Sequence, residues 1–352
     1  MNKLSKIGLS ALCGSLAAIS AANAGEITVS GGATITHTSN SAAETGNPLG
    51  MASSLTFAGS GELDGGQAIG LTIANDDQNA YSSAGISLTT NSLGTFKLSQ
   101  GEGTNGIDAY DDKAPTAWEE VTGTGLGIGQ DQIGGLGGST SVQWTSPSIM
   151  GSTIKLAYAP KNDGVKVNDK ATSGGADGTK GDAYDIVLDL NPPTGDLIGV
   201  NLFGGYHTTD MGGGQQSGIN TETANDREEG TVGLILTVGP VTAGYQRSIE
   251  HTGLTAAASV DAYANTNWGL AFNVNDNLSI SYGEYESKKH FVSSNDAPAR
   301  FLSADSFQIA YTMGGASIKF AETSVSNAAY ASGPTETGPD KEGTTIALSL
   351  AF

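Results

Sequence analysis

The chain has 352 residues, a net charge of -20 and 51 glycines, and hydrophobic residues make up 38% of it. The acidic excess argues against nucleic acid as a partner and against electrostatic docking to anionic lipid. Glycine at this level without collagen periodicity often accompanies disorder, but the apolar residues here fall into short alternating runs, which favours a folded β protein.

Residues 1–24 have the order of a secretory signal peptide. Two lysines precede an apolar run at 7–19, and small residues at 22–24 provide a cleavage site. The apolar run is too short to span a bilayer as a helix. The single cysteine, Cys13, leaves with this segment, so the exported protein forms no disulfide. We therefore expect one exported domain at 25–352.

About sixteen runs in that domain alternate large apolar residues with small or polar ones, which is the period of a β-strand. No later segment has the ~18 unbroken apolar residues of a membrane helix. Each run is close to the ~10 residues that a tilted membrane strand requires. In chain order the runs lie at 26–38, 53–63, 67–75, 82–90, 94–101, 140–146, 152–160, 182–190, 198–208, 229–238, 240–250, 263–274, 277–287, 305–313, 316–325 and 344–352.

The links between the runs alternate short and long. The short ones are rich in the Gly, Pro, Asn and Asp that tight turns need. The link at 76–81 is an exception, because it is brief although it falls in a long position. Such alternation is typical of an up-and-down barrel with turns at one end and loops at the other. The long links are 39–52, 102–139, 161–181, 209–228, 251–262, 288–304 and 326–343.

The two faces of the runs differ in a way that an ordinary protein core does not explain. In TTIALSLAF (344–352), the large apolar residues share one face and small Thr, Ser and Ala residues share the other. A solvated outer face would carry dense charge, whereas small and scattered polar residues suit a water-filled lumen. We therefore predict an all-β transmembrane antiparallel up-and-down β-barrel of about 16 strands, apolar outside.

Some outward positions hold small or charged residues instead of large apolar ones. Gly31 and Ala33 occupy outward positions of the first run and are small, so we expect this edge to meet another subunit. Arg247, Glu284 and Glu286 share the parity of outward tyrosines. We expect these charged residues near long loops, where a strand leaves the hydrocarbon or a bulge shifts its register.

The chain resembles a known family over essentially the whole domain. The resemblance is carried by the signal peptide, by EITVSGGATI directly after it, by SSLTFAGSGEL and GTFKLSQG, and by the terminal TTIALSLAF. These features resemble the general diffusion porins of Gram-negative outer membranes, most closely the alphaproteobacterial porins.

That resemblance implies a homotrimer of sixteen-stranded barrels in the outer membrane, among its lipids and lipopolysaccharide, that passes ions and small hydrophilic solutes passively. It also implies that the third long loop folds into the lumen. The terminal Phe352 would then be the signal read by the outer-membrane assembly machinery.

The third long loop, at 102–138, is the longest in the chain and is acidic. Three lysines have lumen parity, but the second to fourth runs carry no Arg or Lys, which departs from the dense arginine wall of the family. We therefore predict a weak transverse field and a preference for cations. The predicted constriction is Asp108, Asp111, Asp112, Glu119, Glu120 and Asp131, facing Lys97, Lys155 and Lys319.

The sequence contains only weak indications of metal-binding, nucleotide-binding or catalytic sites. Asp108, Asp111 and Asp112 could hold Ca²⁺, although their spacing is not that of an EF-hand loop. GTGLGIG (123–129) lacks the spacing and the lysine of a nucleotide loop and is interpreted as a flexible segment. We predict no other metal or cofactor, and no enzyme. A substrate-selective channel is the nearest alternative, and an outer-membrane enzyme or an adhesin barrel stands as an alternative from another class.

Aromatic residues near the ends of the runs are candidates for the girdles at the two membrane interfaces, because their rings are apolar and their polar groups prefer water. The predicted girdle residues are Trp118, Trp144, Trp268, Tyr158, Tyr184 and Tyr282.

Overall fold

Sixteen strands form in the computed structural model, which describes residues 26–41, 46–77, 82–166, 169–170, 180–195, 197–211, 225–293, 298–331 and 339–352. The predicted signal peptide lies outside these residues. The strands are β1 (Glu26–Asn40), β2 (Leu49–Glu62), β3 (Ala68–Asp76), β4 (Ser83–Thr90), β5 (Gly94–Gln100), β6 (Ser141–Thr145), β7 (Thr153–Ala159), β8 (Ala183–Leu190), β9 (Ile198–Thr209), β10 (Arg227–Val238), β11 (Val241–His251), β12 (Val260–Asn273), β13 (Leu278–Phe291), β14 (Arg300–Met313), β15 (Ala316–Ser326) and β16 (Lys341–Ala351).

Helical structure in the described residues is confined to short 3-10 turns. These are η2 (Ile107–Tyr110), η3 (Val121–Gly123) and η5 (Ala328–Tyr330). Among the described residues, no helix has the length and apolar character needed to cross a membrane.

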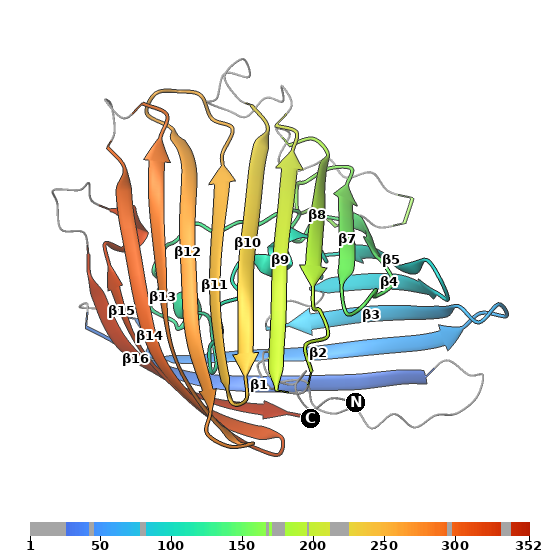
Figure 1. Ribbon diagram of the computed structural model, residues 1–352, viewed down its shortest axis with the longest axis horizontal. Helices are drawn as coiled ribbons and strands as arrows, with labels where there is room; N and C mark the ends of the chain where they lie inside the picture. The colour runs from blue at the N-terminus through green and yellow to red at the C-terminus, as the bar shows by residue number, and fades with distance from the viewer. Residues whose placement is uncertain are drawn as a thin grey trace.

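The strands pair antiparallel with their sequence neighbours, and β1 also pairs with β16, so the sheet closes into a barrel. Ala33 lies opposite Leu350 and Ile35 lies opposite Leu348 at this junction. Figure 1 shows β7 to β13 side by side along one wall, with β1, β2 and β3 running across the other. The predicted all-β up-and-down barrel is confirmed, with sixteen strands.

The barrel is apolar on the outside. In β16 the outward Ile346 and Leu348 expose 48% and 42% of their surface, whereas the inward Ala347 and Ser349 expose 1% and 0%. A water-soluble barrel would show the opposite distribution of large apolar side chains. This pattern matches a membrane barrel, whose outer face is solvated by lipid and whose inner face is polar.

The two rims of the barrel differ. At one rim, here called the turn end, strands are joined by brief links such as 239–240 between β10 and β11 and 314–315 between β14 and β15. At the other, called the loop end, the links are longer, and the longest is 101–140 between β5 and β6. We call 101–140 the inner loop. The predicted sorting of links by length is therefore observed.

Several strands extend further toward the loop end than predicted. β13 continues to Phe291 and β14 begins at Arg300, so the link expected at 288–304 is reduced to 292–299. Residues 287–290 are polar on both faces of the strand, so the alternation in hydrophobicity fades while the hydrogen-bonded ladder continues, with Lys289 opposite Arg300. A register shift lies in β12 between Val260 and Ala262, at the same rim.

Candidate pore constriction

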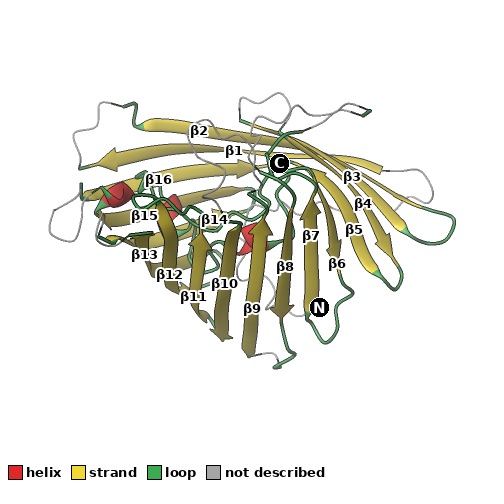
Figure 2. Cartoon of the chain, turned by 90° about the horizontal axis from the view of Figure 1, so that it is seen from above, coloured by secondary structure: helices red, strands yellow, loops and turns green. Residues whose placement is uncertain are grey.

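The inner loop folds into the barrel and packs against its inner wall. Its buried Ile107 and Tyr110 cluster with Phe203, and its Val121 and Ile128 belong to a second cluster on the wall. Each of these four loop side chains is at most 4% exposed. In Figure 1 the loop passes behind β8 to β12, and in Figure 2 its short helical turns lie within the ring of strands. The loop is therefore held by its own apolar face.

A buried pair on the wall anchors the base of the inner loop. His207 Nδ1 and Asp185 Oδ1 are 2.5 Å apart, and both residues are buried. The other oxygen of Asp185 accepts the Ile107 N–H at 3.1 Å. A Cβ atom at Gly106 would lie only 1.8 Å from this oxygen, so only glycine permits such a close approach of the loop backbone.

Gln246, a buried residue of β11, binds the next part of the loop through both ends of its amide. Its Oε1 accepts the Lys113 N–H at 2.7 Å, and its Nε2 donates to the Tyr110 carbonyl at 2.6 Å. Nε2 also donates to the Asp111 carbonyl at 3.1 Å. The amide therefore satisfies backbone groups on both sides of Asp112, which would otherwise be buried without partners.

Gln308, on β14, repeats this arrangement further along the loop. Its Oε1 accepts the N–H groups of Trp118 and Glu119, both at 3.1 Å, and its Nε2 donates to the Glu119 carbonyl at 2.8 Å. The Ala117 N–H donates to Ser281 Oγ at 2.8 Å. The segment 110–119 is thus fixed at two points by glutamines whose exposed fractions are 2% and 0%.

Four carboxylates lie on the segment that the glutamines hold. Burial raises the pKa of Glu120 to about 8, and the charges of Asp112, Asp111 and Glu119 add to this rise. Burial likewise raises the pKa of Asp112 to about 7, although its carboxylate accepts the Ala114 N–H. Glu120 therefore lies close enough to Asp111, Asp112 and Glu119 for their charges to act on its carboxyl group.

The other two acidic residues predicted for the constriction lie elsewhere. Asp108 turns back to the base of the loop, where Thr104 donates to its carboxylate. Asp131 lies on the returning part of the loop, where its carbonyl accepts a hydrogen bond from Asn265 at 3.0 Å. The described residues contain no group of three or more His, Cys, Asp or Glu side chains placed to hold a metal ion, so the three candidate Ca²⁺ ligands do not converge.

Each predicted lysine lies on the inner wall and is matched to a residue of the loop or the wall. Lys97 pairs with Glu102 at 2.8 Å and Lys155 pairs with Asp189 at 3.3 Å. Lys319 lies over the Trp118 ring, 5.6 Å from its centroid. The lysines therefore do not form one basic cluster opposite the carboxylates.

The middle of the wall formed by β1 to β4 is uncharged. The inward positions of β1 to β4 carry Thr, Ser, Gly and Ala, except near the strand ends, where Glu26, Asn40, Glu62 and Asp76 lie. These strands therefore present mainly hydroxyl groups and backbone to the lumen. Lys113, which was not among the predicted site residues, supplies a positive charge within the acidic segment and lies 5.4 Å from the Tyr110 ring centroid.

The returning part of the inner loop alternates exposed glycines with buried residues. Gly123, Gly125, Gly127 and Gly129 are exposed, whereas the intervening Thr124, Leu126 and Ile128 are buried. Gly127 has φ of +58° and a Cβ atom there would meet nothing within 4 Å. The sequence 123–129, interpreted above as a flexible segment, is a ribbon anchored by its buried residues, and among its four glycines only Gly127 has open space around it.

A charged group on β10 and β11 supports the last part of the loop. Arg227 contacts Glu229 at 2.6 Å and Glu250 at 3.0 Å. The Glu229 carboxylate also accepts the N–H groups of Gly134 and Gly135, at 2.9 and 2.7 Å. These inward charged residues on neighbouring strands pair with one another across the ladder, which the strand pattern alone does not indicate.

The prediction that Trp118 belongs to an aromatic girdle at the membrane interface was wrong. Trp118 lies inside the barrel, is 8% exposed and packs against Ala310, Ala321 and Ala347 on the wall. The other five lie in strands with outward parity. Among them, Trp268 donates to Glu284 at 3.1 Å and its ring is 5.8 Å from that of Tyr282.

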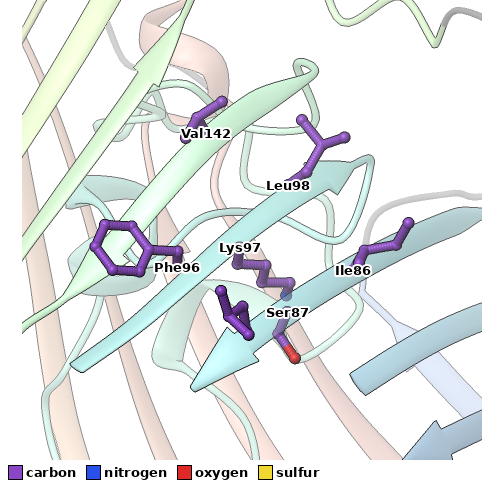
Figure 3. Close-up of a pocket in the computed structure, with 7 residues that line it drawn as sticks. Ile86, Ser87, Phe96, Lys97, Leu98 and Val142 are labelled. Carbon is purple, nitrogen blue, oxygen red and sulfur yellow. The ribbon is translucent and has the colours of Figure 1, made fainter. Parts of the chain in front are cut away.

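The wall around β5 illustrates the two faces. Phe96 and Leu98 point outward with Ile86 and Val142 and line an apolar hollow of about 220 Å³, whereas Lys97 between them faces the lumen (Figure 3). A single strand thus contributes both to the lipid-facing surface and to the pore wall.

Comparisons with known proteins agree with this architecture. The family model described as Gram-negative porin matches residues 8–312. A loop L8 deletion mutant of OmpT, an outer membrane protein of Vibrio cholerae, is similar in structure with a TM-score of 0.63 and 14% identity, over 94% of this chain and 100% of that one.

The trimer form of in-vitro folded OmpT is similar with a TM-score of 0.62 and 12% identity, over 94% of this chain and 100% of that one. A mutant of Rh. blastica porin is similar with a TM-score of 0.55 and 15% identity, over 93% of this chain and 100% of that one. No curated protein matches the sequence. At these identities the solved structures establish the fold alone, whereas the family model covers most of the sequence. The chain belongs to the Gram-negative porin family.

Proposed function

We propose that this porin is a passive diffusion channel of the outer membrane that favours cations among the ions and small hydrophilic solutes it passes. Membership of the porin family and the closed barrel support the channel. The observation that carries the cation preference is the grouping of four carboxylates on the inner loop, together with a wall of β1 to β4 that carries no basic residue at its inward positions. Fixed charge in a narrow lumen acts strongly on passing ions.

The strength of this preference depends on how many carboxylates are ionised. Because burial and mutual repulsion raise the pKa values of Glu120 and Asp112, the constriction carries less than its formal charge at neutral pH. Asp111 and Glu119 have pKa values raised to a smaller extent, so they carry most of the negative charge. The channel is therefore moderately, not strongly, selective for cations.

Reversal potentials across planar bilayers in a KCl gradient test the proposal. We expect the sign of a cation-preferring pore, and a smaller value for a variant with both Glu119→Gln and Glu120→Gln. An anion preference in the unaltered protein contradicts the proposal. A protein that inserts without conducting contradicts the channel itself.

We further propose that the barrel assembles as a homotrimer through the edge that contains β1, among outer-membrane lipids and lipopolysaccharide. Ala33, a small outward residue of β1, favours close approach of another protein wall, whereas the space over Gly31 is taken by the ring of Phe352. Phe352, at the end of the closing strand, is proposed as the signal for the assembly machinery. Conductance steps that occur in threes support the trimer, and single independent steps contradict it.

A further inference from the structure

A small pocket lies in the lumen where the inner loop leaves β5. It has a volume of about 190 Å³ and is lined by residues of β5, β6 and the first part of the loop. Lys97 and Glu102 supply one charge of each sign, and Thr95, Thr145, Asn105 and Gln143 supply neutral polar groups. Its volume exceeds the ~10–15 Å³ that one water needs, so it has room for a small solute.

The two charges form a sheltered ion pair. Lys97 Nζ and Glu102 Oε2 are 2.8 Å apart, and the side chain of Glu102 is only 11% exposed. The pair lies across Gly85 of β4, because a Cβ atom there would be 1.9 Å from Glu102 Oε2 and 2.8 Å from Lys97 Cε. Glycine at this position therefore allows the pair to lie flat on the wall.

Neutral groups around the pair supply both donors and acceptors. Thr95 and Thr145 are directly opposite one another in the β5–β6 ladder, and Lys97 is opposite Gln143. The amide nitrogen of Asn105 donates to the Trp144 carbonyl and to Thr145 Oγ1, both at 2.8 Å. Its Oδ1 is buried and has no hydrogen-bond partner among the described residues.

From this arrangement we infer that the pocket binds zwitterionic solutes of the α-amino acid type as they pass. This inference rests on the proposed channel function. One carbon separates the ammonium and carboxylate groups of an α-amino acid, so its charges lie about as close together as those of Lys97 and Glu102. The solute ammonium can face Glu102 while its carboxylate faces Lys97, and each charge then meets an opposite one.

The same geometry discriminates against other solutes. A simple anion is attracted by Lys97 but repelled by Glu102. A simple cation is attracted by Glu102 but repelled by Lys97. A neutral solute of similar size makes hydrogen bonds but gains nothing from the paired charges. The pocket is thus matched to a solute with no net charge and a large dipole.

Tracer flux into proteoliposomes tests the inference, with free glycine as the probe and glycolamide as an uncharged solute of similar size. We expect the free glycine flux to saturate as its concentration rises, because the pocket fills, while the glycolamide flux rises linearly. In a variant with Lys97→Met and Glu102→Gln, the free glycine flux is expected to become linear while glycolamide still passes.

A second variant, Gly85→Ala, keeps both charges but displaces the pair, and we expect the same loss of saturation. Ile69→Val, on the outer face of β3, is the matched control and should leave the saturation unchanged. A linear free glycine flux in the unaltered protein, or saturation that persists in the double variant, overturns the inference. Absence of glycolamide flux in the unaltered protein overturns the channel function, and this inference with it.

Discussion

Gly31 and Phe352 are joined by two backbone hydrogen bonds, with each N–H donating to the carbonyl of the other residue at 2.9 and 3.0 Å. They extend the β1–β16 ladder by one pair beyond Ala351. The Phe352 ring packs on the outer face at Gly31, where a Cβ atom would be 3.1 Å from the ring and 2.8 Å from the Ser54 carbonyl oxygen. The last residue of the chain therefore occupies space that only glycine leaves open.

Gly31→Val is expected to weaken this junction, because a branched side chain must displace the ring or the β2 backbone. Overpacking of this kind lowers the free energy of unfolding by about 1–3 kcal/mol. The measurement is the temperature at which the folded barrel converts to the unfolded form in heat-modifiability gels. Ile35→Leu, at an exposed outward position further along β1, is the control. An equal loss of stability in both variants contradicts a specific role for Gly31.

The barrel could be predicted from the sequence because its pattern is local. In TTIALSLAF, alternation of large and small residues fixes the strand and both of its faces without knowledge of any partner. The length of the links then gives the topology. The strand ends near Phe291 and Arg300 were missed because the ladder there continues through polar residues, where no apolar face marks it.

The fixation of the inner loop could not be predicted in this way. Gln246 and Gln308 stand in their strands as ordinary inward polar residues, yet their partners on the loop are 133 and 190 residues away. Trp118 was placed at a membrane interface because tryptophan is common there. Trp118 packs against three alanines of the neighbouring strands β14, β15 and β16, which it reaches only when the inner loop has folded into the lumen.

Gln308→Leu is expected to loosen the acidic segment, because the Trp118 and Glu119 N–H groups lose their shared acceptor. A buried donor left without a partner should weaken the binding of the loop to the wall by about 1–3 kcal/mol. We expect larger current fluctuations in single-channel recordings at unchanged barrel stability. Gln308→Glu keeps an acceptor for both N–H groups and should give a smaller effect. Equal noise in the two variants contradicts the role of the Oε1 acceptor.

Trp118→Ala is expected to release the same segment from the wall by a different route. The indole is nearly buried, and loss of a large buried aromatic side chain lowers the packing free energy by about 3–5 kcal/mol. Single-channel conductance should increase because the loop can move away from the lumen centre. Trp118→Phe retains much of the packing and should conduct close to the unaltered level. A lower conductance in the alanine variant contradicts this view of the loop.

The cation preference is expected to depend on pH near neutrality. Glu120 and Asp112 have pKa values raised to about 8 and about 7, so they lose their protons as the pH rises through this range. The constriction then becomes more negative, and the reversal potential in a KCl gradient should shift toward stronger cation preference between pH 6 and pH 9.

The stability of the docked loop depends on pH in the opposite sense: the deprotonation that strengthens the cation preference destabilises the loop. A carboxyl group with a raised pKa holds its proton more tightly in the folded loop than in the unfolded chain. Its contribution is fully present below the ordinary pKa and is lost as the pH rises through about 8, so the loop should also become noisier at high pH. Glu120→Gln removes the titration with the higher pKa and should flatten the upper part of the selectivity curve. A selectivity that is constant over this range, or that weakens as the pH rises, contradicts the placement of these carboxylates in the ion path.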